Sequence, residues 1–314
     1  MDIFIIILFL LGFVLILKAG DLLVESSVWI AEITKIPAMI IGATVVSVAT
    51  TFPETTVAIL ASLSGQEELA LNTSIGSIIC NFTLVLGIAF TVLPSTINST
   101  RFKSKTFYFL FVLVILTICC FWKEISYIHG IILLVIFIIF MFLNVRESKM
   151  SKTEVLISQT RPQTWYVILQ FLVSAACIGY GASVLVKYTR AISEIFGFSE
   201  DFVGLFLIAL GTNIPEIVTT ITSIKKKTPE IGVGNIFGAS IINATMLIGI
   251  ASLLAPDRAI SVNNFMRLVS IPIMYLTLFV VWFPIFKNGK SSRVQGIVLL
   301  LFYLLYSILM ALFI

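Results

Sequence analysis

The sequence predicts an all-α polytopic membrane protein with ten transmembrane helices, arranged as two inverted repeats of five helices. Three observations support this prediction. Of the 314 residues, 59% are hydrophobic and 11% are charged, whereas a soluble domain carries about 25% charged residues. The chain contains ten apolar segments, each close to the roughly 20 residues that cross a bilayer. One polar motif occurs twice inside these segments, at a spacing of 162 residues.

The apolar segments follow one another with short polar loops between them. Residues 3–17 lack the basic flank and the cleavage site of a signal peptide, so we expect them to remain as the first span. The fourth and fifth segments are separated only by Lys123, Glu124 and His129. The ten segments are centred near residues 13, 50, 82, 113, 135, 175, 212, 242, 275 and 303.

The longest polar stretch, residues 144–164, divides the chain into two sets of five spans. It is too short to fold as a domain, so we interpret it as a cytoplasmic linker. The sequence therefore predicts a first transmembrane repeat over residues 1–143 and a second over residues 165–314.

The loop charges predict the orientation. If the N-terminus lies outside, the loops on the cytoplasmic side carry fourteen lysines and arginines and the opposite loops carry five. Such an excess is typical of cytoplasmic loops, so we expect both termini outside a plasma membrane and a second repeat that enters from the opposite side. The cytoplasmic set is Lys35, Arg101, Lys103, Lys105, Arg146, Lys149, Lys152, Arg161, Lys225, Lys226, Lys227, Lys287, Lys290 and Arg293. The outer set is Lys123, Lys187, Arg190, Arg258 and Arg267.

The repeated motif contains a glutamate in each copy. The first copy reads Thr50-Thr51-Phe52-Pro53-Glu54 and the second reads Thr212-Asn213-Ile214-Pro215-Glu216. A carboxylate inside a membrane span costs about 2.5 kcal/mol or more and is a candidate functional residue by default. The same 162-residue shift relates six further pairs: Gly42 and Gly204, Gly76 and Gly238, Asn81 and Asn243, Thr83 and Thr245, Gly87 and Gly249, and Pro94 and Pro256.

The prolines of the motif predict a broken helix in each copy. Proline removes one backbone donor and clashes with the carbonyl four residues earlier, which belongs to Ala49 in one copy and to Gly211 in the other. Carbonyl, hydroxyl and carboxylate oxygens would then lie within about one turn, near 5.4 Å. These are the hard oxygen ligands that calcium binds.

A second element supplies neutral oxygens. Gly76-Ser77-Ile78-Ile79-Cys80-Asn81 and Gly238-Ala239-Ser240-Ile241-Ile242-Asn243 combine small residues, which let helices approach closely, with polar ones. Ser77, Asn81 and Asn243 are therefore candidate ligands, and interhelical hydrogen bonding is the alternative for each. A single threonine of the motif can equally bond its own backbone.

Together these motifs resemble the two α-repeats of the sodium/calcium exchangers, within the cation/calcium antiporter superfamily. The resemblance covers residues 38–94 and 200–256. It implies that Glu54 and Glu216 are shared calcium and sodium ligands. It also implies further ligands among Thr50, Thr51, Thr212, Asn213 and Ser77, and backbone carbonyls at Ser47 and Ala209.

The chain departs from the family pattern at five positions. In the first copy, Ala49 and Thr51 stand where glycine and serine are usual. In the second repeat, Asn213 stands where a serine is usual and Ala239 lacks the serine hydroxyl of the family. Asn243 stands where the potassium-dependent branch and some prokaryotic relatives carry aspartate. These changes concern ion stoichiometry and cation identity, and they leave the antiporter interpretation intact.

The sequence therefore predicts a secondary active cation antiporter and not an enzyme. We expect sodium-driven calcium exchange by alternating access at a midplane site, with a proton/calcium antiporter of the same fold as the alternative. The transported ions would be Ca²⁺ and Na⁺, or H⁺ in the alternative, without a prosthetic group. We expect a monomer in the bilayer that binds no nucleic acid. An intramembrane metalloenzyme is disfavoured because the only histidine, His129, lies outside both repeats, and a passive channel would favour neutral pore linings.

Overall fold

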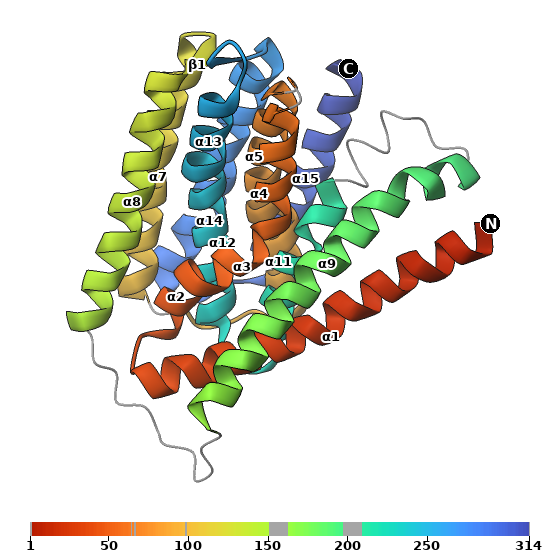
Figure 1. Ribbon diagram of the computed structural model, residues 1–314. Coiled ribbons are helices and arrows are strands. Elements are labelled where there is room, and N and C mark those ends of the chain that lie inside the picture. The colour runs from red at the N-terminus through yellow and green to blue at the C-terminus, as the bar shows by residue number, and fades with distance from the viewer. Residues whose placement is uncertain are drawn as a thin grey trace. The chain divides into compact units, whose positions relative to one another are not determined.

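The computed structural model of the protein describes residues 2–63, 65, 67–97, 99–150, 163–196 and 209–313. The chain forms two compact units (Figure 1). The first unit comprises Met1–Thr50 and Leu143–Ile236, and the second comprises Thr51–Phe142 and Phe237–Ile314. Each unit therefore combines segments from both halves of the sequence.

The first unit is built around two long helices. α1 (Asp2–Thr34) and α9 (Thr164–Phe196) lie side by side (Figure 1). Their apolar faces share a core that includes Leu23 and Ile178. The other elements of this unit are α2 (Ala38–Ile41), η1 (Gly42–Val46), α3 (Ser47–Thr50), α11 (Ala209–Lys225) and the first part of α12 (Pro229–Ile242).

The second unit contains most of the remaining helices. Its core holds aromatic rings, with Phe82 stacked on Phe109 at 4.8 Å between centroids and Phe237 edge-on to Phe82 at 5.2 Å. A short antiparallel sheet pairs β1 (Glu124–Ser126) with β2 (Ala259–Ser261), with Ile125 opposite Ile260. The helices are α4 (Phe52–Leu63), α5 (Glu67–Cys80), η2 (Asn81–Val85), α6 (Leu86–Val92), α7 (Ser99–Phe121), α8 (Tyr127–Met150), η4 (Asn243–Leu247), α13 (Ile248–Leu254), η5 (Met266–Ser270), α14 (Ile271–Asn288) and α15 (Arg293–Phe313). The end of α8, from Leu143 on, belongs to the first unit, and the end of α12, from Phe237 on, belongs to the second.

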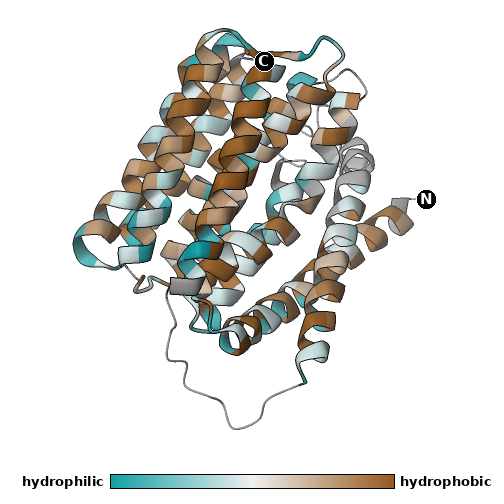
Figure 2. Ribbon diagram, turned by 60° about the vertical axis from the view of Figure 1, so that its left-hand side comes forward, coloured by the Kyte–Doolittle hydropathy of each residue, from teal (hydrophilic) through white to brown (hydrophobic). Residues whose placement is uncertain are grey.

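The membrane character predicted from the sequence is confirmed. Within the described residues, eight helices are long and apolar enough to span a membrane, and α2–α3 with α4 makes a ninth if this bent pair is one span. The helices are hydrophobic over most of their length, with hydrophilic residues near their ends (Figure 2). The span expected near residue 212 corresponds to α11, and residues 197–208 before it lie outside the described part. The expected linker begins as helix, since α8 continues to Met150, and residues 151–162 also lie outside the description.

Candidate functional site

The two glutamates of the repeated motif are buried. Glu54 is 1% exposed and Glu216 is 0% exposed. The other expected ligands lie in the same two units, and their side chains are also buried where the structure describes them. The first unit holds Ser47, Thr50, Thr212, Asn213 and Glu216. The second holds Thr51, Glu54, Ser77, Asn81 and Asn243. Ala209 begins α11, and its side chain lies outside the described residues.

Glu216 lies on α11, one turn after Thr212. The helix break predicted at Pro215 is not found, because α11 runs from Ala209 to Lys225 through the proline. A proline removes only one hydrogen bond of the helical ladder, and a membrane helix can absorb this loss with a local adjustment. Thr219 lies one turn after Pro215, and its hydroxyl donates a hydrogen bond to the Pro215 carbonyl. Glu216 is therefore held on a continuous helix.

Glycines bring the neighbouring helices of the first unit close together. A Cβ atom on Gly42 would lie 2.2 Å from the carbonyl oxygen of Ile231, so the backbones of η1 and α12 are in direct contact. A Cβ on Gly232 would lie 2.3 Å from the Ser223 hydroxyl of α11. The first part of α12 therefore packs closely against both elements, as small residues allow in membrane helices. Thr50, at the end of α3, lies beside the Glu216 carboxylate.

Glu54 lies in the first turn of α4, directly after a break in the helix. The break predicted at Pro53 is confirmed here, since Thr51 forms a turn between α3 and α4. Proline fits the first turn of a helix because its missing N–H has no partner there. A carboxylate in this turn also interacts favourably with the helix dipole. The Thr51 carbonyl accepts a hydrogen bond from the Thr55 amide at 2.9 Å.

The second unit gathers the other expected oxygens around the Glu54 helix. α4 packs against α5, which carries Ser77, and against η4, which begins at Asn243. α5 also contacts η4. The structure thus brings together the elements that carry Glu54, Ser77 and Asn243.

Two buried polar residues were missed by the sequence analysis. Ser240 accepts a hydrogen bond from Asn81 Nδ2 at 3.3 Å, and Asn235 accepts one from the Thr50 hydroxyl at 3.1 Å. Both are 0% exposed. The 162-residue repeat could not indicate them, because their counterparts are Ile78 and Thr73. The only available signal was the presence of polar residues in an otherwise apolar stretch of α12.

Both glycine-containing elements end in a π-helical turn. η2 begins at Asn81 and η4 begins at the equivalent Asn243. Within each turn a threonine donates to the carbonyl four residues earlier: Thr83 to Ile79 and Thr245 to Ile241, each at 2.5 Å. Each hydroxyl therefore adds a side-chain donor to a carbonyl of the helical turn that leads into the π turn. Such turns are frequent at functional sites, and here each begins at one of the two asparagines proposed as ligands.

Several buried oxygens have no hydrogen-bond donor. Among the described residues, neither carboxylate oxygen of Glu216 accepts a hydrogen bond, and neither does the Oδ1 atom of Asn81 or of Asn243. An unsatisfied buried oxygen is costly. A hard cation is the partner that carboxylate and amide oxygens would bind. The chemistry of these residues therefore fits a cation as the transported substrate.

Clusters of histidine and cysteine side chains are typical of resident metal sites. The described residues contain no group of three or more His, Cys, Asp or Glu side chains placed to hold a metal. The Nδ1 atom of His129 accepts a hydrogen bond from the Ser126 amide at 3.2 Å, at the start of α8.

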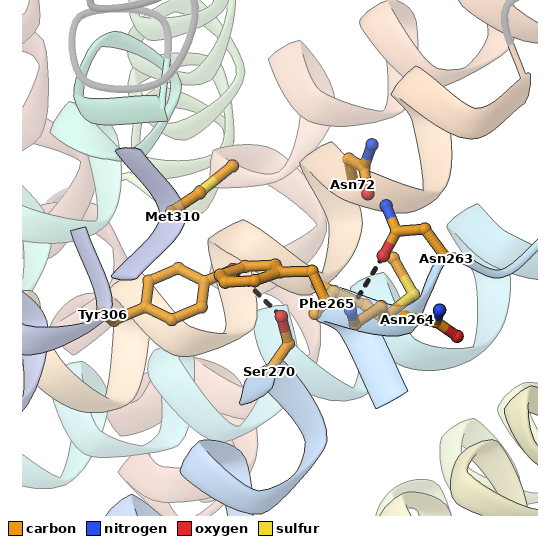
Figure 3. Close-up of a pocket in the computed structure, with 9 residues that line it drawn as sticks. Asn72, Asn263, Asn264, Phe265, Ser270, Tyr306 and Met310 are labelled. Carbon is orange, nitrogen blue, oxygen red and sulfur yellow. Dashed lines mark hydrogen bonds between the residues drawn. The ribbon is translucent and has the colours of Figure 1, made fainter. Parts of the chain in front are cut away.

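The second unit also contains a pocket of about 340 Å³ that none of the expected ligands lines. Asn72, Asn263, Asn264, Ser270 and Tyr306 provide its polar wall (Figure 3). Several of these groups already bond to each other or to the backbone. Asn263 Oδ1 accepts from the Met266 amide at 2.8 Å, and the hydroxyls of Ser270 and Tyr306 lie 3.2 Å apart (Figure 3). This pocket is therefore distinct from the buried glutamates.

Comparison with known proteins agrees with the resemblance seen in the motifs. The family model described as sodium/calcium exchanger protein matches residues 4–146 and 166–312. The chain is 31% identical to the inner membrane protein YrbG of Escherichia coli over 260 residues, which cover 80% of each protein. It is 23% identical to the sodium/calcium exchanger MaX1 of Methanosarcina acetivorans, over 97% of each.

Solved structures show the same fold. The sodium-calcium exchanger NCX_Mj, soaked with 10 mM Na⁺ and no Ca²⁺, matches with a TM-score of 0.85 and 26% identity. The match covers 97% of this chain and 98% of that one. The same exchanger soaked with 2.5 mM Na⁺ and 10 mM Sr²⁺ matches with a TM-score of 0.84. The chain belongs to the sodium/calcium exchanger family, a family of cation/calcium antiporters.

Proposed function

We propose that this protein exchanges sodium for calcium by alternating access, with Glu54 and Glu216 binding the same calcium ion. The observation that carries the proposal is the pair of fully buried glutamates at equivalent positions of two inverted repeats. Transporters built from inverted repeats place their substrate site at the repeat interface near the bilayer midplane. The relatives named as sodium/calcium exchangers support the choice of ions.

The charges explain how the two ions would be coupled. Two carboxylates supply a charge of −2, which neutralises one calcium ion. Sodium ions that bind to the same oxygens neutralise this charge as well. Either ion therefore allows the site to switch from facing one side of the membrane to facing the other. Because the two loads use overlapping oxygens, they exclude each other, and this competition couples their fluxes.

The other expected ligands complete the coordination. Calcium takes about six to eight oxygens, more than two carboxylates provide. Thr50, Thr51, Thr212, Asn213, Ser77, Asn81 and Asn243, with backbone carbonyls at Ser47 and Ala209, are the proposed additional ligands. We further propose a plasma-membrane location with both termini outside, in agreement with the loop charges, and function as a monomer.

Proton coupling is the second candidate, and the neutral residues of the second repeat favour it. Ala239 offers no hydroxyl, and Asn213 and Asn243 bring amide groups whose NH₂ needs its own acceptor. Fewer hydroxyl and carboxylate oxygens leave fewer sodium positions. In this case Glu54 and Glu216 would bind protons when calcium leaves.

Proteoliposomes distinguish the two. Calcium uptake would be measured with an outward sodium gradient at equal pH, and then with an outward proton gradient in sodium-free buffer. Uptake that follows the sodium gradient supports the proposal, and uptake that follows only the pH gradient supports the second candidate. Uptake that responds to neither gradient would contradict both.

A further inference from the structure

Asn235 is a fully buried amide in the first unit that the repeat does not explain. It lies on α12, is 0% exposed, and its counterpart in the first repeat is Thr73, which is partly exposed. The Thr50 hydroxyl donates to Asn235 Oδ1 at 3.1 Å. Among the described residues, Asn235 Nδ2 has no hydrogen-bond partner. Within the described part of the chain, this buried side chain therefore has only its oxygen bonded.

The Thr50 hydroxyl has one proton and three neighbouring acceptors. These are Asn235 Oδ1, the Ser47 carbonyl at 3.4 Å, and the carboxylate of Glu216 beside it. An amide oxygen can only accept, so the hydroxyl is the donor toward Asn235. A proton directed at Glu216 would instead occupy the space that a bound cation needs.

A hydroxyl binds a cation through its oxygen lone pairs, so its proton must point elsewhere. Two acceptors can take this proton without using Glu216, and Asn235 Oδ1 at 3.1 Å is closer than the Ser47 carbonyl at 3.4 Å. The fold holds this acceptor in place, because the backbone of α12 is in direct contact with η1 at Gly42 and with α11 at Gly232.

We propose that Asn235 is a positioning residue: it accepts the proton of Thr50, so that the Thr50 oxygen presents its lone pairs to a cation bound at Glu216. This inference rests on the proposed function, since it requires a cation at that glutamate. It also makes the two repeats unequal. The repeat counterparts of Asn235 and Thr50 are Thr73 and Thr212, and Thr73 has no amide group.

The test combines Asn235→Ala with Thr50→Val, which removes the hydroxyl and keeps the side-chain shape. The readouts are half-saturating calcium in proteoliposome uptake and the calcium-dependent rise in Tm of the purified protein. Each single variant should raise half-saturating calcium about five- to tenfold, the effect of one hydrogen bond to a ligand. The double variant should match Thr50→Val alone, since Asn235 acts only through that hydroxyl.

Two further variants separate positioning from packing. Asn235→Asp keeps an acceptor oxygen and should bind calcium at least as well as the wild type. Asn144→Ala removes another buried amide of the same unit. It should leave half-saturating calcium unchanged, whatever its effect on the Tm without ions.

Effects of Asn235→Ala and Thr50→Val that simply add would overturn the positioning role, and so would wild-type half-saturation in Asn235→Ala. Both results require that the wild type takes up calcium. A wild type that neither takes up calcium nor gains Tm with it would overturn the proposed function instead.

Discussion

Asn81 donates a hydrogen bond from Nδ2 to the Oγ atom of Ser240 over 3.3 Å, and both residues are fully buried. Asn81 belongs to the first repeat and Ser240 to the second, where it follows Ala239 directly. The bond uses one amide hydrogen of Asn81 and leaves Oδ1 without a donor. Ser240 thereby fixes which end of the amide is available to a cation.

Replacing Ser240 should therefore weaken calcium binding although Ser240 is not itself proposed as a ligand. In Ser240→Ala the Asn81 amide can rotate, and we expect a loss of about 0.5–1.5 kcal/mol, the net contribution of one hydrogen bond. The measurement is half-saturating calcium for uptake. Ser252→Ala is the matched control, because Ser252 is also buried and its hydroxyl donates to the Gly249 carbonyl of its own helix. Equal behaviour of the two variants would contradict the positioning of Asn81 by Ser240.

The two glutamates should both be essential. Glu54→Gln and Glu216→Gln each remove half of the charge that neutralises calcium while keeping the side-chain volume. We expect each variant to insert in the membrane and to lose calcium exchange. Glu124→Gln, at an exposed position of β1, should exchange at the wild-type rate. Wild-type exchange in either of the first two variants would rule out a shared site.

Much of the fold could be predicted because membrane spans depend on local composition. The apolar segments, the family and the helix break before Glu54 all follow from short stretches of sequence. The same motif gave a wrong prediction at Pro215, where the helix continues. A proline removes the same donor in both copies, but whether a helix then breaks depends on the packing around it.

The contacts of the site required the folded chain. Asn235 and Thr50 are 185 residues apart, and Asn81 and Ser240 are 159 apart. Neither pair follows the 162-residue repeat, so the repeat symmetry could not have predicted these contacts. The compact units likewise combine segments that are distant in the sequence. From the sequence alone, the chain divides instead at the polar stretch of residues 144–164.

The threonines of the two π turns should maintain the direction of the site asparagines. Thr83→Val and Thr245→Val remove the hydroxyls that donate to the carbonyls of Ile79 and Ile241. We expect each to lower stability by about 0.5–1.5 kcal/mol, the net contribution of one hydrogen bond, and to raise half-saturating calcium. Thermal unfolding and calcium uptake are the two measurements.

The matched control for the π turns is Thr106→Val. Thr106 is buried in the regular helix α7, and its hydroxyl donates to Phe102 at 2.9 Å. Its loss should lower stability by a similar amount and leave half-saturating calcium unchanged. If Thr106→Val weakens calcium uptake as much as the other two variants, the π turns have no special role.

The loop charges predict that the C-terminus faces outward. A cysteine added after Ile314, in a background without Cys80, Cys119, Cys120 and Cys177, should react with a membrane-impermeant thiol reagent on intact cells. Reaction only after lysis would reverse the orientation and place residues 144–164 outside. A cysteine in place of Ser292, in a loop of the opposite side, serves as the control and should react only after lysis.

Ala239 is the departure from the family with the clearest consequence for ion selectivity. It is 0% exposed, and it lies between the glycine and the serine of the sequence Gly238-Ala239-Ser240. A serine here would add one hydroxyl oxygen, and its proton could go to the carbonyl of Asn235 one turn earlier. Ala239→Ser should therefore strengthen the competition of sodium against calcium by about 1 kcal/mol, or roughly fivefold.

The measurement for this variant is the sodium concentration that half-inhibits calcium uptake. Ala251→Ser controls for a hydroxyl placed at another buried position of the same unit and should leave this concentration unchanged. An unchanged value in Ala239→Ser would make position 239 a packing residue only. Sodium that fails to compete in the wild type and in the variant would favour proton coupling, because the carboxylates would then exchange calcium for protons without a sodium-bound state.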